Sequence, residues 1–174
     1  MSNRFYILAL IICVCFAVGC KNEPATEANY VKGLQKYSES DWENAADAFK
    51  KASEINPKFP DAYVGLARTV IKLNKPKEAS DACKEALKIN PQHPEANAVL
   101  GYALTKQGKR KDALQAIETA IKLNPQLPEA YFYLGYYHIA DRATENKEEA
   151  MKAQRALGTL DQKLGKELLN AINR

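Results

Sequence analysis

A ten-residue phrase recurs along the chain at a constant step. Its copies begin at residues 54, 88 and 122 and read EINPKFPDAY, KINPQHPEAN and KLNPQLPEAY, so each begins 34 residues after the one before. A fixed period between about 20 and 50 residues is typical of stacked supersecondary units, each of which buries its apolar face against its neighbours. The sequence therefore predicts a repeat array.

The residues between the phrases align at the same step. Each unit holds two segments with apolar residues at i, i+3 and i+4, which is the period of an amphipathic helix. Small and larger apolar residues recur in fixed columns, which are Gly33, Ala67, Gly101 and Gly135; Leu66, Leu100 and Leu134; Ala45, Ala79 and Ala113; Phe49, Cys83 and Ile117; and Ala52, Ala86 and Ala120. We expect each unit to be a helix pair whose members approach closely at the small residues.

The recurring phrase separates one helix pair from the next. An Asn-Pro step ends the second helix of a pair, because the residue before a proline is disfavoured in the α region. The second proline of the phrase opens the next helix, where a missing N–H leaves no hydrogen bond unmade. An acidic residue follows at once, and negative charge is favourable at a helix N-terminus.

The column pattern of an aromatic residue, Leu-Gly, Ala-x3-Phe and Pro resembles the tetratricopeptide repeat. The resemblance covers residues 26 to about 157. It implies an all-α fold, a right-handed α-solenoid of antiparallel helix pairs. The repeats are expected over residues 26–59, 60–93, 94–127 and 128–158.

The fourth repeat and the C-terminus are irregular. Three residues are inserted before the second helix of the fourth repeat, and Gln154 occupies a column that is aromatic in the family. Thr159 and Gln162 have the spacing of a capping box, which predicts a last helix over residues 159–174. This helix would either cap the solenoid or form a dimer through its apolar stripe, which consists of Leu160, Leu164, Leu168 and Ile172.

The N-terminus has the pattern of an export signal. An apolar run over residues 5–20 is shorter than the ~20 residues that a membrane-spanning helix needs. It ends in Ala17-Val18-Gly19-Cys20, which resembles the lipobox of bacterial lipoproteins, although Ala17 replaces the usual leucine. The resemblance implies a cleaved signal peptide over residues 1–19, a lipid on Cys20 and a tether over residues 20–25. Ordinary secretion and an uncleaved anchor are the alternatives.

Composition and side-chain spacing favour a non-catalytic protein. The net charge of +4 is too mild for a typical nucleic-acid-binding protein. His93 and His138 have no partners at metal-ligand spacing, and no phosphate-binding loop or nucleophile motif occurs. Cys83 falls in a packing column, where a small buried apolar residue is expected. We therefore expect no enzymatic activity, no metal and no cofactor other than the lipid.

Basic residues gather in two turns between helices. Either they form a solvated surface, or they are attracted to anionic lipid headgroups near the anchor. The residues are Lys72, Lys75 and Lys77 in one turn and Lys106, Lys109, Arg110 and Lys111 in the other.

The family resemblance also implies a binding surface, because the first helix of every pair in such a solenoid lines the concave face. Stepping along these helices at i, i+4 and i+7 gives a stripe rich in tyrosine, the composition of an interface core. The predicted groove residues are Tyr30, Leu34, Tyr37, Val64, Arg68, Ile71, Tyr102, Thr105, Phe132, Tyr133 and Tyr136, with Ala98 and Ile139 on the same stripe. The alternative is that these aromatic residues only pack against neighbouring helices.

The function expected from these patterns is that of a membrane-anchored adaptor of the bacterial cell envelope. It would face the periplasm or the cell exterior and bind a protein or peptide in the groove. Some members of the family bind acidic peptide tails through Lys/Asn-rich grooves. This stripe lacks that set and fits an apolar or aromatic peptide or helix better. Alternatives are an assembly factor that escorts a secretin of a type IV pilus or secretion system, a scaffold for peptidoglycan enzymes, and a structural homo-oligomer.

Overall fold

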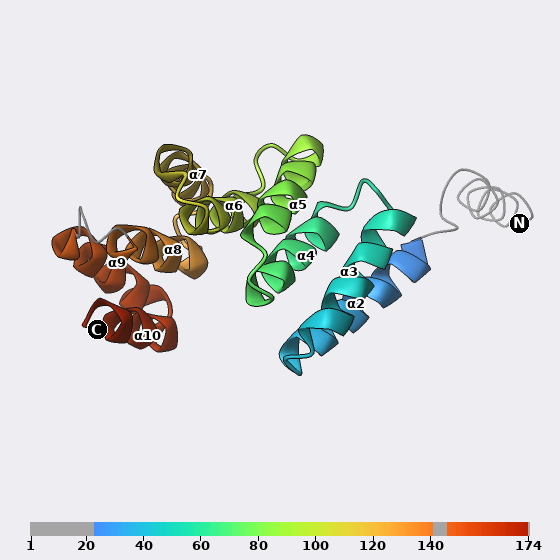
Figure 1. The fold of residues 1–174 in the computed structure, drawn as a ribbon, viewed down its shortest axis with the longest axis horizontal. Helices are drawn as coiled ribbons and strands as arrows, with labels where there is room; N and C mark the ends of the chain where they lie inside the picture. The colour runs from blue at the N-terminus through green and yellow to red at the C-terminus, as the bar shows by residue number, and fades with distance from the viewer. Residues whose placement is uncertain (1–22, 141–145, 174) are drawn as a thin grey trace, which may run out of the picture.

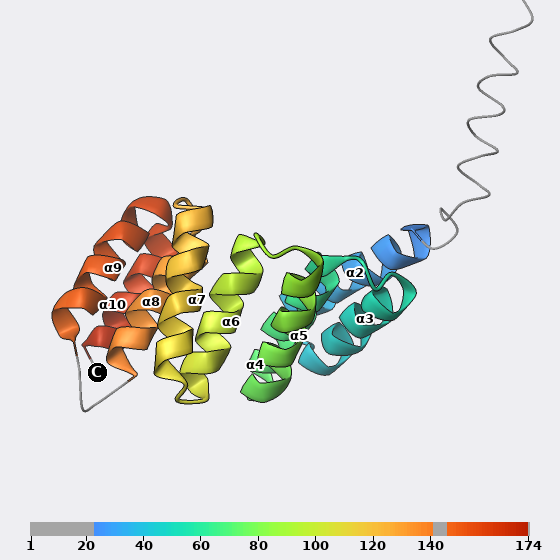
Figure 2. The ribbon, with the colours of Figure 1, turned by 90° about the horizontal axis from the view of Figure 1, so that it is seen from above.

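The computed structural model describes residues 23–140 and 146–173. Within these ranges the chain forms nine helices and no strands. They are α2 (Glu23–Ser38), α3 (Trp42–Ile55), α4 (Pro60–Lys72), α5 (Pro76–Ile89), α6 (Pro94–Lys106), α7 (Arg110–Leu123), α8 (Pro128–Ile139), α9 (Lys147–Leu160) and α10 (Gln162–Ile172). Figures 1 and 2 show antiparallel pairs that succeed one another along the long axis. The predicted all-α solenoid is confirmed.

The first helices of the pairs form an inner layer. Helix α4 contacts α2 and α6, and α8 contacts α6 and α10, whereas the described second helices α3, α5, α7 and α9 do not contact one another. Helix α10 therefore takes the place that the first helix of a fifth pair would have. Since the first helices are the more closely packed row, they line the inside of the curve.

The Asn-Pro step ends its helix by a repeated turn. Asn56, Asn90 and Asn124 are the C-caps of α3, α5 and α7, and all three have extended backbone angles. The side-chain oxygen of each accepts a hydrogen bond from the N–H two residues later, at 3.0–3.1 Å. This Asx turn explains why asparagine recurs in the phrase together with proline.

The turn inside each of the first three pairs repeats a left-handed residue. Ser40, Asn74 and Gly108 have φ values of 60°, 58° and 73° and are again 34 residues apart. In each turn the next N–H bonds back to a carbonyl five residues earlier, as from Lys109 to Leu104 at 3.0 Å. This is the Schellman arrangement, in which a left-handed residue closes a helix.

The core depends on glycines that face large side chains. A Cβ on Gly33 or Gly65 would lie within 2.7 Å of the Phe49 ring, and a Cβ on Gly101 would lie 2.4 Å from Ile117. Phe49 and Ile117 are almost completely buried. The glycines allow α2, α4 and α6 to approach the helices that carry these side chains.

The fourth pair is completed by α10. Gln154 lies where a large apolar residue was expected, and its side chain donates to the Gly165 carbonyl of α10. The missing apolar contact comes from Leu168 of α10, because a Cβ on Gly135 would lie 2.4 Å from it. Leu168 is fully buried and Ile172 is 4% exposed, so this part of the stripe packs within the chain.

The predicted capping box at Thr159 and Gln162 is wrong. Thr159 lies inside α9, which continues to Leu160, and its hydroxyl donates to the Ala156 carbonyl. Asp161 ends α9 and also caps α10, with its carboxylate accepting from the Leu164 N–H at 3.0 Å. One residue thus replaces the Asn-Pro phrase, and α10 begins at Gln162.

Candidate functional site: the concave groove

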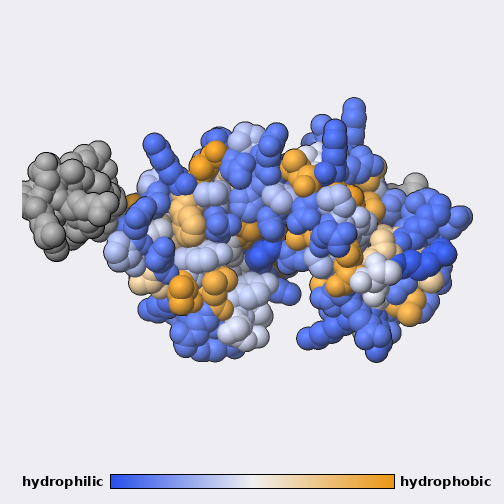
Figure 3. Space-filling view, turned by 180° about the vertical axis from the view of Figure 1, so that it is seen from behind, coloured by the Kyte–Doolittle hydropathy of each residue, from blue (hydrophilic) through white to orange (hydrophobic). Residues whose placement is uncertain are grey.

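The inner layer of helices borders two adjoining cavities. The space-filling view from behind shows the molecule indented along its lower edge, between the N-terminal and C-terminal helices (Figure 3). Residues from α2, α4, α6, α8 and α10 contribute to the cavities, together with Phe49 of α3 and Leu127, which precedes α8. The concave face therefore offers a continuous hollow made by every unit.

The first cavity has a volume of about 280 Å³ and lies against α2 and α4. Aromatic and apolar side chains form most of its wall, and two carboxylates lie at the first turns of α4 and α6. Its lining residues are Tyr30, Leu34, Tyr37, Phe49, Asp61, Val64, Gly65, Arg68, Glu95 and Leu127.

The second cavity has a volume of about 420 Å³ and lies between α4, α6, α8 and α10. It shares Tyr37 and Arg68 with the first cavity, so the two adjoin at these side chains. Its lining residues are Tyr37, Arg68, Ile71, Lys72, Tyr102, Lys106, Glu129, Phe132, Tyr133, Leu164 and Glu167.

The structure brings most of the predicted groove residues together. All of them except Thr105 and Tyr136 line one of the cavities. Val64 contributes only a floor, being 3% exposed, and Ala98 is fully buried. Thr105 is buried and its hydroxyl donates to the Gly101 carbonyl, so its expected surface position is wrong. The part that the lining residues take in binding stays a prediction.

Three tyrosines form a packed cluster at the second cavity, and two of them, Tyr102 and Tyr133, line its wall. The rings of Tyr102 and Tyr133 stack at 4.6 Å, and Tyr136 meets Tyr102 edge-on at 4.9 Å. The Lys106 ammonium lies 5.8 Å and 5.2 Å from the ring centres of Tyr102 and Tyr136. Burial raises the pKa of Tyr102 and, more strongly, that of Tyr133, while interaction with the Tyr136 hydroxyl raises the pKa of Lys106. At neutral pH Tyr102 and Tyr133 are therefore neutral phenols beside the Lys106 ammonium.

Arg68 is the one charged residue among the predicted groove residues, and it is paired within the chain. Its guanidinium forms an ion pair with Glu129 of α8. This ion pair joins α4 to α8, the helices on either side of α6. Burial is the largest single effect and disfavours the charge on Arg68, but Glu129 and the nearby Tyr133, Tyr37 and Glu95 together outweigh it and keep the pKa of Arg68 above its ordinary value. Arg68 Nε is buried and has no hydrogen-bond partner among the residues that the structure describes. The ion pair marks the boundary between the two cavities.

The predicted groove did not include the charged residues at the ends of its helices. Asp61 and Glu95 precede the predicted stripe by one turn, three residues before Val64 and Ala98. Lys72 and Lys106 lie four residues after Arg68 and Tyr102, directly after the last predicted positions, Ile71 and Thr105. Continuing the i, i+4 stepping over the whole helix would have found them, because residues four apart share one face.

His93 joins Asp61, one of the two carboxylates of the first cavity, to the start of α6. It is the N-cap of α6 and is 7% exposed. Its Nδ1 accepts from the Ala96 N–H at 3.4 Å, so its Nε2 donates to Asp61 Oδ1 at 3.1 Å. Glu95 Oε2 lies 3.2 Å from the same Nδ1. The histidine thus holds the first turns of α4 and α6 in a fixed relation.

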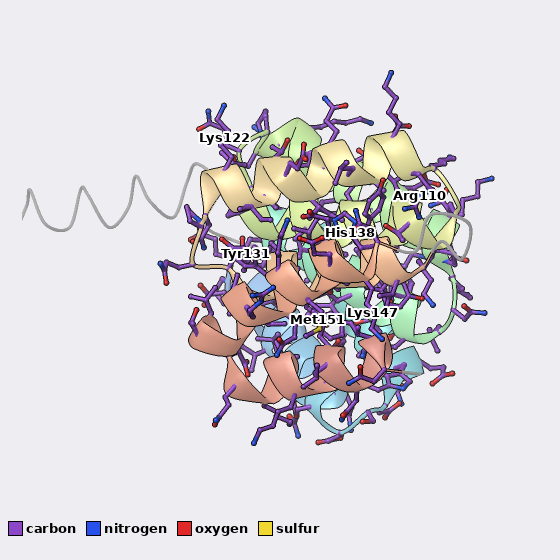
Figure 4. The ribbon with its side chains drawn as sticks, turned by 90° about the vertical axis from the view of Figure 1, so that its left-hand side faces the viewer. Arg110, Lys122, Tyr131, His138, Lys147 and Met151 are labelled. Atoms are coloured by element: carbon purple, nitrogen blue, oxygen red, sulfur yellow. The ribbon has the colours of Figure 1, made fainter. Side chains whose placement is uncertain are left out.

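The basic turn after α6 serves packing as well as the groove. Figure 4 looks onto the C-terminal end and shows Arg110 and His138 at one end of the antiparallel helices α7 and α8, with Lys122 and Tyr131 at the other. Arg110 lies 4.2 Å above the Tyr137 ring and donates to the Tyr137 carbonyl.

The pKa of His138, next to Tyr137, is lowered by partial burial. Arg110 makes a smaller contribution in the same direction, and Glu149 has the opposing effect.

Comparison with known families supports the repeat pattern. The tetratricopeptide repeat family matches residues 36–100 and 75–134, which together exceed half of the chain. The chain belongs to the tetratricopeptide repeat family. A comparison with curated protein sequences gave no match.

Solved structures of tetratricopeptide repeat proteins share the fold. A thermophilic TPR protein of Thermus thermophilus has a TM-score of 0.73 at 23% identity, over 86% of this chain and 84% of that one. YrrB, described as a TPR protein with an unusual peptide-binding site, has a TM-score of 0.61 at 23% identity, over 84% and 75%. The first TPR of Spaghetti, bound to the HSP90 peptide SRMEEVD, has a TM-score of 0.62 at 20% identity, over 82% and 99%.

The lipid anchor, membrane-spanning helices and metal sites are considered next. The predicted lipid attachment at Cys20 lies outside the described residues. None of the helices at residues 23–140 and 146–173 combines the length and apolarity needed to cross a membrane. The same ranges contain no group of three or more His, Cys, Asp or Glu side chains placed to hold a metal ion.

Proposed function

We propose that this tetratricopeptide repeat protein is a non-enzymatic adaptor whose concave groove binds a segment of a partner protein. The observation that carries the proposal is the pair of adjoining cavities lined by tyrosines, apolar side chains and charged residues from all the inner helices. Interfaces are enriched in tyrosine and arginine. The peptide-binding site described for YrrB and the HSP90 peptide bound to the first TPR of Spaghetti support a similar use of this fold.

Photo-crosslinking from the groove tests this proposal. Tyr37 lines both cavities, so benzoylphenylalanine at this position should crosslink a second protein in extracts of the source cells. The matched control carries the crosslinker at Glu118, which is exposed on the outer helix α7. Partner adducts of equal yield from both positions, or none from Tyr37, would refute the groove as the working surface.

We also infer that a lipid on Cys20 holds the adaptor at a bacterial membrane, facing the periplasm or the cell exterior. The support is the Ala17-Val18-Gly19-Cys20 pattern after an apolar run too short to span a bilayer. Cys20 stands three residues before α2, a reach of at most ~10 Å. The anchor would therefore keep the N-terminal end of the groove close to the lipid surface.

Metabolic labelling tests the anchor separately from the groove. Wild-type protein should incorporate an alkyne-tagged fatty acid, and Cys20→Ala should lose the label and accumulate as the unprocessed precursor. Cys83→Ala is the control, because this buried thiol lies in the core and should leave the label unchanged. Undiminished labelling of Cys20→Ala would show that the lipobox interpretation is wrong.

The structure supports a capping role for α10 over the alternative of dimer formation through its stripe. Leu168 and Ile172 are buried within the chain against a cluster that includes Ala150 and Leu157. The apolar area that a dimer would need is thus largely used in the monomer. We therefore expect the adaptor to act through the groove rather than by assembly through α10.

A further inference from the structure

The charges on the concave face are sorted by sign. Asp61 and Glu95, in the first turns of α4 and α6, line the first cavity. Lys72 and Lys106, the last residues of the same helices, line the second cavity. Because these first helices run parallel, one edge of the groove is acidic and the other is basic.

The remaining groove charges do not cancel this polarity. Arg68 and Glu129 neutralise each other as an ion pair between the cavities. Among the described residues that line the second cavity, Glu167 of α10 is then the one unpaired carboxylate that accompanies the two lysines. The first cavity keeps two acidic groups, and the second keeps an excess of positive charge.

The two lysines are held in place without a carboxylate of their own. Lys72 lies 6.0 Å from the Trp42 ring centre, and Lys106 lies over two tyrosine rings. Lys75 and Lys88 pair with acids one turn away, but the sequence places no acid at i±3 or i±4 from Lys72 or Lys106. Within the described ranges they form no ion pair, so their ammonium groups are available to an anion in the cavity.

We propose that the groove selects a peptide segment of split charge, with a basic residue and an acidic residue on either side of an apolar or aromatic one. This inference rests on the proposed function of the groove. The basic residue binds between Asp61 and Glu95, and the acidic residue binds between Lys72 and Lys106. The apolar residue lies over Tyr37, where the cavities adjoin. Recognition uses side chains along the segment and does not need a free C-terminal carboxylate.

The same charges also favour helix formation, since acids stabilise helix N-termini and bases stabilise C-termini. The outer helices provide matched controls for this effect. Lys88 and Lys122 occupy the last turns of α5 and α7, as Lys72 and Lys106 do in α4 and α6, but they line neither groove cavity. Reversal of either pair of charges should therefore lower stability, with the control pair also losing the exposed Lys88–Glu85 ion pair, and only reversal of the groove pair should alter binding.

Charge-patterned peptides test the proposal on the full chain in mild detergent. Acetylated and amidated peptides of about twelve residues reach ~40 Å when extended, about twice the length of a 13-residue helix such as α4. One peptide has Lys at one end, Leu and Tyr in the middle and Glu at the other end; a second has the reverse order. A third alternates the charges at the same composition. Binding is measured by fluorescence anisotropy.

At least one split-charge peptide should bind about tenfold more tightly than the alternating one, as complementary potentials favour one arrangement over another. Lys72→Glu/Lys106→Glu should weaken that binding at least about tenfold, and Lys88→Glu/Lys122→Glu should change it less than about twofold. Asp61→Asn/Glu95→Gln should weaken it as well. Circular dichroism melting of every variant confirms that it is folded.

The outcomes separate this proposal from the function on which it rests. Equal affinity for all three peptides, retained in the Lys72→Glu/Lys106→Glu variant, would overturn the charge rule. Crosslinking from Tyr37 would still report whether the groove binds a partner. Absence of binding by both split-charge peptides at millimolar concentration would also overturn the rule, again without deciding the crosslinking result.

Discussion

The contact between Gly101 and Ile117 permits a quantitative test of how the helix pairs pack. A Cβ on Gly101 would lie 2.4 Å from Ile117 Cγ1 and 3.0 Å from the Ala113 carbonyl oxygen. The equivalent positions of the preceding unit hold Ala67 and Cys83, both fully buried. A glycine thus faces a large residue in one unit, and an alanine faces a small one in the other.

The magnitudes follow from these distances. Gly101→Ala gains about 1 kcal/mol of helix propensity and loses about 1–3 kcal/mol through overpacking against Ile117, for a net loss of about 1 kcal/mol. Ile117→Cys removes buried apolar atoms and should cost about 1–3 kcal/mol. In the double variant the clash is relieved, so its unfolding free energy should exceed the additive value by about 1–2 kcal/mol.

Urea denaturation followed by far-ultraviolet circular dichroism measures all four proteins of this cycle. The reciprocal cycle transfers the large residue to the other unit. There Cys83→Ile should be strongly destabilising, and Ala67→Gly should recover part of the loss. Additivity within about 0.5 kcal/mol in both cycles would refute the reasoning, because residues in contact of this kind should be coupled.

Three further predictions concern the charged and titratable groups. Glu129→Gln should lower the unfolding free energy by about 1–2 kcal/mol in urea denaturation, since Arg68 loses its counter-ion. The double variant Arg68→Met/Glu129→Leu should lose less unfolding free energy than this single change, because it leaves no unpaired charge. Burial raises the pKa of Cys83 to about 12, so thiol labelling near neutral pH, in a chain without its other three cysteines, should be slow until denaturant unfolds the protein; rapid labelling of the native state would contradict this. The pKa of His138 is lowered in the folded state, so the wild type should lose stability relative to His138→Gln as the pH falls below ~6.5 and through the folded pKa. An equal change of melting temperature with pH in the two proteins across this range would contradict this prediction.

The helix pairs could be predicted from the sequence because the period, the prolines and the small residues all specify the same local structure. Asn56 and its equivalents carry their own turn chemistry, so the ends of α3, α5 and α7 follow from a short stretch of sequence. The fourth pair could not be predicted as fully. Its missing large residue is supplied by Leu168, which is distant along the chain from Gly135, and no periodic rule within the pair indicates that contact.

The sequence predicted which residues share the concave face, but not the contacts that form between helices there. Helical stepping identifies the residues that share a face, and it placed Tyr37 and Tyr102 correctly in the cavity walls. It does not identify ion pairs between helices, so the neutralisation of Arg68 by Glu129 could not be foreseen. From the sequence, the acidic residues were interpreted only as helix stabilisers and the lysines only as a solvated or lipid-facing surface, although their positions also place them on the concave face.

Internal comparison of the repeats separates the residues that build this solenoid from those that distinguish its units. The packing column of Ala45, Ala79, Ala113 and Ala150 is the same in every unit, and all four alanines are fully buried. The central column of the concave face holds Leu34, Arg68, Tyr102 and Tyr136, which change chemistry from the first unit to the third. A surface that only had to pack neighbouring helices could have used one residue type at each step, as the alanine column does. On the proposed function, a ligand that touches the first three units would meet the apolar Leu34, the ion-paired Arg68 and then the aromatic Tyr102, so shifting it by one unit would exchange favourable contacts for unfavourable ones. The groove is therefore suited to hold a non-repetitive segment in a single register.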